Sequence, residues 1–286
     1  MPELPEVEMA RENLERWLVD RTIDRARVQD RRVLRGQSVH RMEGLLRGAR
    51  LLGILRRGKY LRWNLGSRGE VLSHLGMTGK FVFCTRAKPD PDATCVVLRL
   101  NDGNRVVFSD PRRFGRFQIV EAKTRQTFER IGLDALDRRL TARRLAELLG
   151  SSRLSVKTFL MDQSRIGGLG NIYAAEALYW AGIHPLRPAK RLGLEEIRTL
   201  RRSIRHTLQA TLRRERSREI AYLHEKNAEN RFLVYGRAGE ACFRCGASVR
   251  KIVQLGRSTY YCAHCQPRRP RAGHRAPSLR AGVRQP

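Results

Sequence analysis

The sequence predicts an α+β protein of several domains, and three observations support this prediction. Apolar residues follow a period of two in the first half of the chain and a helical period after about residue 130. Four of the six cysteines form two CxxC pairs near the C-terminus. With 286 residues, the chain is long enough for two domains or one large one, each with its own core.

The first half is expected to be a β-sandwich or flattened barrel with a helix laid against it. Apolar positions on one face predict that leading helix over residues 5–19. Residues 22–121 have a strand period; in KYLRWNL at 59–65, alternate side chains share a face. Asp102-Gly103 predicts a hairpin between two strand-like runs. Several short strands with Gly-rich turns are typical of a sandwich.

The second half is expected to be helical. A helical period occurs in TARRLAELLG, VKTFLMD, NIYAAEALYWAG and LEEIRTLRRSIRHTLQATL. In the last of these segments the apolar stripe consists of Leu194, Ile197, Leu200, Ile204 and Leu208.

The charge of the chain predicts a polyanionic partner, most often nucleic acid. The net charge is +30, from 58 Lys and Arg against 28 Asp and Glu. An Arg-rich composition from a GC-rich genome would explain part of this excess. The tail 267–286 holds six arginines, four prolines and no acid, and we expect it to be disordered. Without those six arginines the body still carries +24, so it is itself basic.

The start of the chain is acidic and lacks the apolar segment of a signal peptide. No stretch approaches the about 18 apolar residues of a membrane span. We therefore expect a cytoplasmic protein that does not enter a membrane. Cys84 and Cys95 lie in strand-like runs and are expected to be buried, reduced thiols.

The remaining cysteines predict a structural zinc site. Cys242 and Cys245 are followed, after 16 residues, by Cys262 and Cys265. Four thiolates fill a tetrahedral coordination sphere and leave no position for a catalytic water. Two redox CxxC motifs are the alternative, but neither lies in a βαβ pattern. The residues between the pairs predict two short strands around a turn, with Arg257 at its tip.

A glycine-rich turn precedes one of the expected helices. Three glycines within residues 167–170 lead into Asn171, which is a good N-cap residue. Exposed amides at such a turn and helix start would form a seat for an anion such as a backbone phosphate. Such a turn alone is weak evidence for phosphate binding.

The N-terminal MPELPEVEMA raises a chemical question. A small second residue usually leads to removal of Met1, which would leave Pro2 with a free secondary amine. That amine is either an idle terminus or a nucleophile. Glu3 and Glu6 are either ordinary acids at a helix N-terminus or part of the same site.

Several stretches together carry a family resemblance. They are MPELPEVE at the terminus, RRGKYL at 56–61, HLGMTG at 74–79, DPRRFG at 110–115, GLGNIYAAEALYWAGIHP at 168–185, VYGRAGE at 234–240 and the zinc hairpin. Over roughly residues 1–266, the chain resembles the formamidopyrimidine-DNA glycosylases, bacterial repair enzymes that remove oxidised purines and then cut the strand. The related endonuclease VIII group usually begins PEGPE, so Leu4 favours the purine-repair branch.

The resemblance implies four parts. A catalytic β-sandwich would span residues 1–130, a helix–two-turns–helix domain residues 131–230 and a zinc finger residues 231–266, followed by the basic tail 267–286. The partner would be double-stranded DNA containing a damaged base, the cofactor one structural zinc ion, and the protein a monomer.

The resemblance also implies the chemistry. Pro2 would attack C1′ of the damaged nucleotide and form an iminium, and β- and δ-elimination would then cut the strand. Glu3 would handle protons, and Glu6 would support the site. Lys59 would contact the phosphate on the lesion side and aid catalysis; otherwise it is an exposed strand lysine. Arg257 is placed with the catalytic residues because it would hold a phosphate; otherwise it is a solvated hairpin tip.

Other positions would contact DNA or replace the flipped base. Asn171 and Lys157 match phosphate contacts, and His74 is either a phosphate contact or a satisfied interior histidine. The three residues that would fill the vacated stack are Met77, Arg112 and Phe114. Their alternatives are core packing for Met77 and Phe114, and a turn arginine for Arg112.

One segment departs from the family. RERSREIAYLHEKNAENRFLVYGR at 214–237 lacks the double glycine that usually precedes the loop over the flipped base. Because the loop at 216–233 is the part that departs from the family, the base preference stays open. Oxidised pyrimidines or abasic sites are the alternative substrates. A non-catalytic zinc-ribbon protein that binds nucleic acid is a second alternative.

Overall fold

The structure is a computed structural model that describes residues 2–215 and 229–268. These residues form two compact units, one built on residues 2–130 and the other on residues 131–214 and 229–268. The tail expected to be disordered lies outside the described residues from residue 269 onward. Within the described ranges, no helix is both long enough and apolar enough to cross a membrane.

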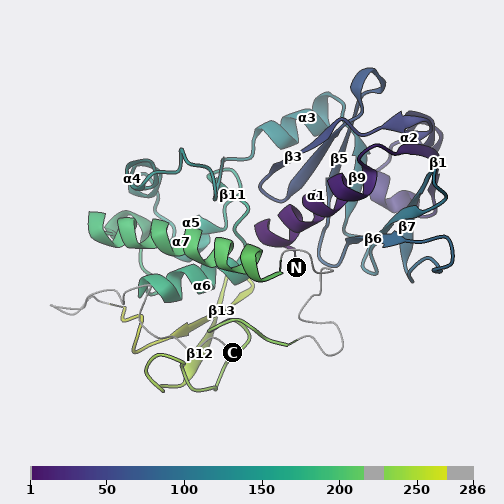
Figure 1. The fold of residues 1–286 in the computed structure, drawn as a ribbon. Coiled ribbons are helices and arrows are strands. Elements are labelled where there is room, and N and C mark those ends of the chain that lie inside the picture. Colours follow the sequence, from purple (N-terminus) through teal and green to yellow (C-terminus); the bar gives the residue numbers. More distant parts are fainter. Residues whose placement is uncertain (1, 216–228, 269–286) are drawn as a thin grey trace. The chain divides into compact units, whose positions relative to one another are not determined.

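Two antiparallel sheets make up most of the first unit (Figure 1). One has the strand order β2-β1-β7-β8-β6, and the other has the order β3-β4-β5-β9. The strands are β1 (Thr22–Val28), β2 (Ala49–Arg50), β3 (Gly53–Arg57), β4 (Tyr60–Asn64), β5 (Glu70–His74), β6 (Lys80–Cys84), β7 (Thr94–Leu100), β8 (Arg105–Ser109) and β9 (Arg116–Ile119).

Aromatic side chains from both sheets meet in one core. Phe81 and Phe108 come from the first sheet, and Trp63 and Phe117 come from the second. The ring centroids of Trp63 and Phe81 lie 5.5 Å apart, and those of Phe108 and Phe117 lie 6.3 Å apart. All four side chains are buried. Facing sheets that interdigitate in this way form a sandwich, so the predicted fold of this unit is confirmed.

Helix α1 (Leu4–Leu18) is the predicted leading helix, and it packs against β3, β4 and β6. The strand period predicted for residues 22–121 is interrupted, however, by the 3₁₀ helix η1 (Arg31–Leu34) and by α2 (Val39–Leu46). Local caps explain both: the Asp30 side chain accepts the backbone N–H of Arg32, and Ser38 Oγ accepts that of Arg41. The unit is completed by η2 (Gly66–Arg68) and α3 (Ala122–Glu129).

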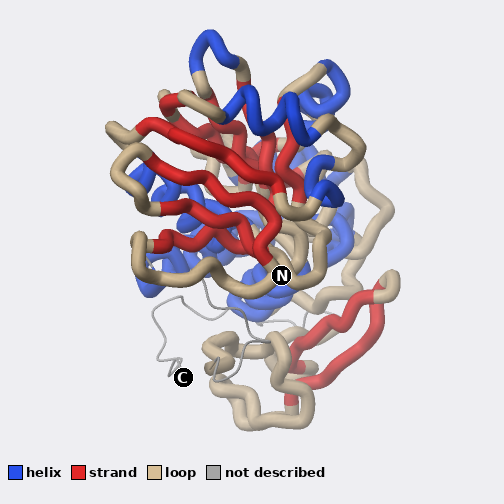
Figure 2. The backbone as a smooth tube through the Cα atoms, turned by 90° about the vertical axis from the view of Figure 1, so that its right-hand side faces the viewer, coloured by secondary structure: helices blue, strands red, loops and turns tan. Residues whose placement is uncertain are grey.

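The second unit contains the four predicted helices and the predicted hairpin. Its elements are β10 (Leu133–Asp134), α4 (Ala142–Gly150), α5 (Val156–Leu160), β11 (Ile166–Gly167), α6 (Asn171–Ala181), η3 (Ala189–Arg191), α7 (Leu194–Glu215), β12 (Val249–Gln254) and β13 (Arg257–Cys262). Strands β12 and β13 form an antiparallel pair (Figure 2). The stripe predicted for α7 is buried except for Leu194, which is 52% exposed because it begins the helix, before the turn that packs.

Helix α6 is the centre of this second unit. Every residue from Ile172 to Ala181 is buried, and the helix contacts both α5 and β13. A helix that is apolar on all sides is a core helix. Its two ends can therefore hold neighbouring segments in fixed positions.

Gly76 allows the loop after β5 to touch the turn before β9 in the first unit. Its φ is +66°, and an added Cβ would lie 2.5 Å from the carbonyl carbon of Phe114 and 2.5 Å from the nitrogen of Gly115. Both neighbours are backbone atoms, so no side chain fits at this position.

Gly76→Ala should lower the free energy of unfolding by at least about 2 kcal/mol, because it adds backbone strain and a clash. Urea unfolding followed by tryptophan fluorescence measures this. The matched control is Gly44→Ala in α2, where an added Cβ meets nothing within 4 Å. That control should be neutral or stabilising by up to about 1 kcal/mol. Equal stabilities of the two variants would contradict the close approach.

Candidate active site and nucleic-acid interface

Pro2 and Glu3 lie directly before the first residue of helix α1. Both residues are buried, and Glu3 is 0% exposed. A capping box fixes Glu3: its side chain accepts the backbone N–H of Glu6, and the Glu6 carboxylate accepts the backbone N–H of Glu3 at 2.8 Å. Glu6 thus positions the backbone of Glu3, the residue that follows Pro2. Met1 lies outside the described residues.

Lys59 lies in the two-residue turn between β3 and β4, and it is 8% exposed. Gly58 begins this turn with a φ of +58°, as a tight hairpin requires. The turn is tied to helix α1 because Arg56 forms an ion pair with Glu8 and donates from Nη1 to the Gly58 carbonyl at 3.1 Å. Glu8 was not singled out in the sequence, although it is the residue that connects the two segments.

Arg11 and Arg56 together make Glu8 a stable anchor. Burial alone would raise the pKa of the Glu8 carboxyl, but hydrogen bonds and the charges of these two arginines lower it below its ordinary value. Arg11 donates from Nε to Glu8 at 2.8 Å. Glu8 is therefore ionised at neutral pH, and the link between α1 and the Lys59 turn persists.

His74, at the end of β5, faces the same turn. It pairs with Tyr60 across the sheet, with ring centroids 4.5 Å apart, and its Nδ1 accepts the backbone N–H of Gly76 at 3.0 Å. Burial, followed by the positive charges of Lys59, Arg116 and Arg35, lowers the pKa of His74 to about 3. The ring is therefore neutral, with its proton on Nε2, and any phosphate contact would be a hydrogen bond without a positive charge.

The expected void-filling residues lie on two loops that contact each other. Met77 follows Gly76, and Arg112 and Phe114 lie in the turn before β9. Asp110, which is 0% exposed, organises the contact. It accepts from Thr78 Oγ1 at 2.5 Å, from the backbone N–H of Arg112 at 3.2 Å and from that of Gly115 at 2.7 Å.

Two of these three side chains are exposed. Phe114 is 47% exposed and Arg112 is exposed, with its guanidinium 4.9 Å from the centre of the Phe114 ring. Met77 is half-buried. Core packing therefore does not account for Phe114, and an exposed aromatic stacked with a cation suits contact with nucleic-acid bases.

In the second unit, Lys157 and Asn171 form a buried cluster with the zinc hairpin. Lys157 is 1% exposed, and its Nζ donates to Asn171 Oδ1 at 2.5 Å and to Thr259 Oγ1 at 2.7 Å. Asn171 Nδ2 donates to the Ser258 carbonyl at 2.9 Å. Arg257, at the start of β13, is exposed and lies two residues before Thr259.

The expectation that Asn171 caps α6 is wrong. The cap is Gly170, and Asn171 is the first residue of the helix. The physical reason is that Gly170 adopts the extended backbone of a cap (φ −135°), while the Asn171 amide is engaged by Lys157 and the hairpin. Asn171 therefore joins the start of α6 to β13 instead of closing its own helix.

Glu176 is a second residue that sequence reasoning missed. It is 3% exposed, in the middle of α6, and its carboxylate accepts three consecutive backbone N–H groups from Leu233, Val234 and Tyr235 at 2.9, 2.9 and 3.0 Å. It thus anchors the residues that lead from segment 216–228 into the zinc finger. Its one signal in the sequence is that it is an acidic residue in an otherwise apolar helical segment.

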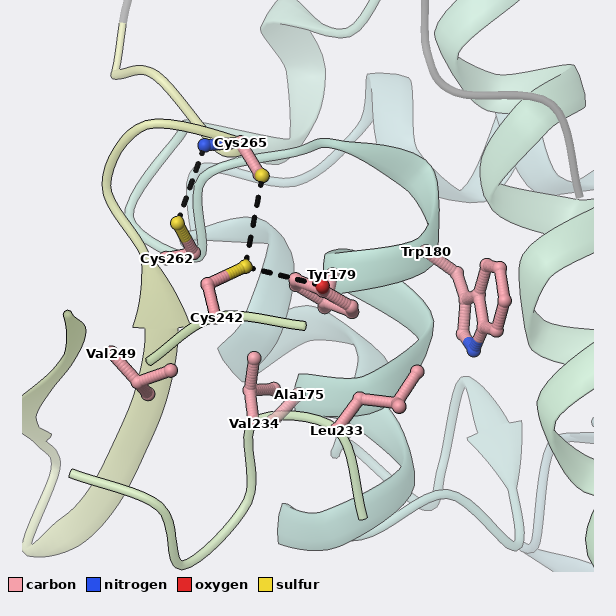
Figure 3. Packing of buried hydrophobic residues seen from close by; sticks show 9 residues of the cluster. All are labelled: Ala175, Tyr179, Trp180, Leu233, Val234, Cys242, Val249, Cys262 and Cys265. Atoms are coloured by element: carbon pink, nitrogen blue, oxygen red, sulfur yellow. Dashed lines mark hydrogen bonds between the residues drawn. The ribbon is translucent and has the colours of Figure 1, made fainter. Parts of the chain in front are cut away.

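The four cysteine sulfurs converge on one point. All four lie within 4.8 Å of one another; Cys242 and Cys265 are separated by 3.9 Å, and Cys245 and Cys262 by 3.5 Å. Tetrahedral zinc with bonds of about 2.3 Å to sulfur requires separations of about 3.8 Å. The set therefore fits one structural zinc ion. Figure 3 shows three of the cysteines packed with Tyr179 of α6.

Comparisons with known proteins agree with this geometry. Residues 1–117 match the family model of the formamidopyrimidine-DNA glycosylase N-terminal domain, residues 131–221 that of its H2TH domain, and residues 239–268 that of the zinc finger found in FPG and IleRS. The chain is 38% identical over 275 residues to formamidopyrimidine-DNA glycosylase of Roseiflexus sp. (strain RS-1), covering 93% of this chain and 100% of that one. The chain belongs to the formamidopyrimidine-DNA glycosylase family.

Further relatives of this family extend the likeness. Formamidopyrimidine-DNA glycosylase of Symbiobacterium thermophilum is 35% identical over 302 residues, covering 100% of this chain and 99% of that one. The Lactococcus lactis enzyme bound to DNA with an abasic site is 31% identical, with a TM-score of 0.82 over 93% of this chain and 99% of that one. The structure of its complex with Fapy-dG-containing DNA is 30% identical in sequence, with a TM-score of 0.82 over 93% of this chain and 100% of that one.

Family membership decides the class of protein. Members of the family are DNA glycosylases with abasic-site lyase activity, and the chain is a DNA-binding repair enzyme of that class. The N-terminal domain and the H2TH domain match as well as the zinc finger, so the alternative of a zinc-ribbon protein without catalysis is set aside. The four cysteines hold its zinc.

The depressed pKa of His74 predicts an acid-sensitive contribution to stability. Between about pH 6.5 and about pH 3 the unfolded chain protonates this histidine and the folded chain does not, so stability is lost as the pH falls through 6.5. The free energy of unfolding should drop by up to about 1.4 kcal/mol per pH unit relative to His74→Gln. Urea unfolding at pH 7.0 and pH 4.5 gives the difference. A difference between wild type and variant that is independent of pH would contradict a neutral His74.

Proposed function

We propose that the chain removes oxidised purines, formamidopyrimidines and 8-oxoguanine, from double-stranded DNA and cuts the strand by β,δ-elimination. The observation that carries the proposal is the start of α1, where a capping box holds Pro2 directly before the fully buried Glu3. After loss of Met1, the Pro2 nitrogen is a secondary amine. The positive end of the α1 dipole favours its neutral, nucleophilic form.

The reaction follows from the chemistry of that amine. The lone pair of the Pro2 nitrogen attacks C1′, and the bond to the damaged base breaks, so that the base leaves with its electron pair. Glu3 supplies and removes the protons that open the sugar. The resulting iminium draws electrons from C2′, whose proton is lost as the 3′ phosphate leaves. A second elimination frees the 5′ phosphate.

The remaining residues bind DNA in this proposal. Lys59 and Arg257 hold phosphates beside the reacting sugar, with support from a neutral His74. Lys157 and Asn171 orient the zinc hairpin and the start of α6, which suits a phosphate contact made in part through backbone amides. The side chains that replace the extruded base in the stack are Met77, Arg112 and Phe114.

The base preference rests on the family branch. Leu4 of the PELPE start supports purines, and Lactococcus lactis relatives have been solved with Fapy-dG-containing DNA. Residues 216–228 of the segment that departs from the family lie outside the described residues. Oxidised pyrimidines and abasic sites are the second candidate substrates for the same chemistry, because the missing double glycine weakens the assignment to 8-oxoguanine.

We further propose the division into residues 1–130, 131–230, 231–266 and 267–286, with the protein acting as a monomer in the bacterial cytoplasm. The basic charge and the reduced, metal-binding cysteines support this setting. Sedimentation with and without a damaged duplex measures the stoichiometry, and a 1:1 complex is expected.

Borohydride trapping on four duplexes tests both the chemistry and the substrate. The duplexes carry 8-oxoguanine, formamidopyrimidine, thymine glycol or an abasic site. We expect covalent complexes with the two purine lesions and with the abasic site, because borohydride reduces the iminium. A chain with a blocked N-terminus should not be trapped. Preference for thymine glycol would move the substrate to pyrimidines, and efficient trapping of the blocked chain would remove Pro2 from the mechanism.

Glu3→Gln separates catalysis from folding in the same assay. Base removal should fall by about 10²-fold or more, the range for loss of a proton-transfer group. The matched control is Glu195→Gln, an acid in the first turn of α7 whose side chain is 78% exposed, and it should be fully active. Unchanged base removal by Glu3→Gln would show that Glu3 only caps the helix.

A further inference from the structure

Tyr179 of helix α6 contacts a zinc ligand. Its hydroxyl oxygen lies 3.3 Å from Cys242 Sγ, and the side chain is 0% exposed (Figure 3). Tyr179 is distant in the sequence from the zinc finger and belongs to the core helix of the unit. The contact therefore joins the metal centre to the scaffold that carries it.

Coordination to zinc decides the direction of this hydrogen bond. A cysteine bound to zinc is a thiolate and has no proton to donate. The phenol of tyrosine has an ordinary pKa of about 10 and keeps its proton at neutral pH. Tyr179 must therefore donate its O–H to the Cys242 thiolate.

Arg244 lies over the face of the same ring. Its guanidinium carbon is 4.4 Å from the centre of the Tyr179 ring and 5.6 Å from that of Trp180, and its Nη1 donates to the Tyr179 carbonyl at 3.1 Å. Its Nε and Nη2 are buried and have no hydrogen-bond partner among the described residues. The two aromatic faces are its remaining partners.

The charge of the metal centre explains why a guanidinium with two buried nitrogens, Nε and Nη2, is stable there. Four thiolates and one Zn²⁺ carry a net charge of −2, and Arg244 lies between two of the ligands in sequence, Cys242 and Cys245. A nearby cation offsets that charge. A cation over the ring also draws electron density from the phenol and makes its O–H a stronger donor.

We propose that Tyr179 and Arg244 form an outer shell that retains zinc and holds the finger on helix α6. The finger is then attached at both ends of the helix. At its start, Asn171 donates to the Ser258 carbonyl at 2.9 Å; near its end, Tyr179 donates to Cys242. Outer-shell partners of metal ligands typically contribute about 10–100-fold to metal affinity. The proposal holds whichever base the enzyme removes.

Zinc release from the full-length protein tests the proposal. Zinc-loaded wild type and Tyr179→Phe are placed in excess chelator, and the metal is followed with a chromophoric indicator. Tyr179→Phe should release zinc about 10–100-fold faster, because it loses only the hydroxyl. The matched control is Tyr261→Phe, a buried tyrosine of the same finger whose ring packs on His184 at 4.6 Å; it should behave as wild type.

Three outcomes decide the test. Release by Tyr179→Phe at the wild-type rate would overturn the proposal, and so would equal acceleration by Tyr261→Phe, which would show a general loosening of the finger. A Tyr179→Phe protein purified without zinc, beside a zinc-loaded control, is the extreme form of the expected result.

A spectroscopic measurement separates the hydrogen bond from packing. With Co²⁺ in place of zinc, loss of the O–H donor raises the energy of the thiolate electrons. The sulfur-to-cobalt charge-transfer band of Tyr179→Phe should therefore move to longer wavelength, while that of Tyr261→Phe should not move. An unshifted band in Tyr179→Phe would overturn the hydrogen bond.

Arg244→Gln tests the link between the two outer-shell residues. It should also accelerate zinc release. The double variant with Tyr179→Phe should release zinc more slowly than the product of the two single-variant accelerations predicts. A double variant whose acceleration equals that product would show that Arg244 acts independently and would remove it from the shell.

Discussion

A proline nitrogen is a nucleophile only at the free end of a chain, and the capping box of Glu3 and Glu6 is the interaction that holds this end in place. The backbone N–H of Glu3 donates to the Glu6 carboxylate at 2.8 Å, one residue after the proposed nucleophile Pro2. A chain terminus is ordinarily mobile, so the proposed role of the Pro2 amine as a catalytic group depends on this fixation. Further hydrogen bonds and ion pairs in the first unit hold the loops that carry the other site residues.

Charged side chains, rather than apolar core contacts, hold the neighbouring loops in place. Glu8 of α1 pairs with Arg56, and Arg56 holds the turn that carries Lys59. Asp110 holds the exposed Phe114 loop by accepting backbone N–H groups, as Glu176 does for residues 233–235 in the second unit. In each case a carboxylate fixes the backbone of a loop. The exposure of the held residues differs, because Phe114 is exposed whereas Lys59, Leu233 and Val234 are buried.

The sequence was most informative where a chemical requirement fixes residue spacing. Four thiolates around one metal need two tight turns, so the CxxC pairs predicted the zinc centre directly. The sandwich and its leading helix followed from apolar periodicity. The site residues of the first unit came from the family resemblance, since a single lysine or methionine has no local signal.

Two of the remaining features depend on partners far away in the chain. Glu176 binds backbone N–H groups 57–59 residues later, and no pattern of side chains marks such groups. Asn171 is a residue type that favours the N-cap position. In the folded chain its side-chain amide instead forms hydrogen bonds with Lys157 and with Ser258 of β13. Helix α2 lies inside residues 22–121, where the strand period on either side of it predicts strands throughout.

The most direct test of the central claim is the position of the covalent bond in the reduced enzyme–DNA complex. The complex is digested with nuclease and protease, and the peptide that carries the sugar remnant is fragmented by mass spectrometry. The account predicts that the remnant is on the N-terminal peptide, at the nitrogen of Pro2, with Met1 absent. A remnant on a lysine Nζ, such as that of Lys59 or Lys157, would contradict it.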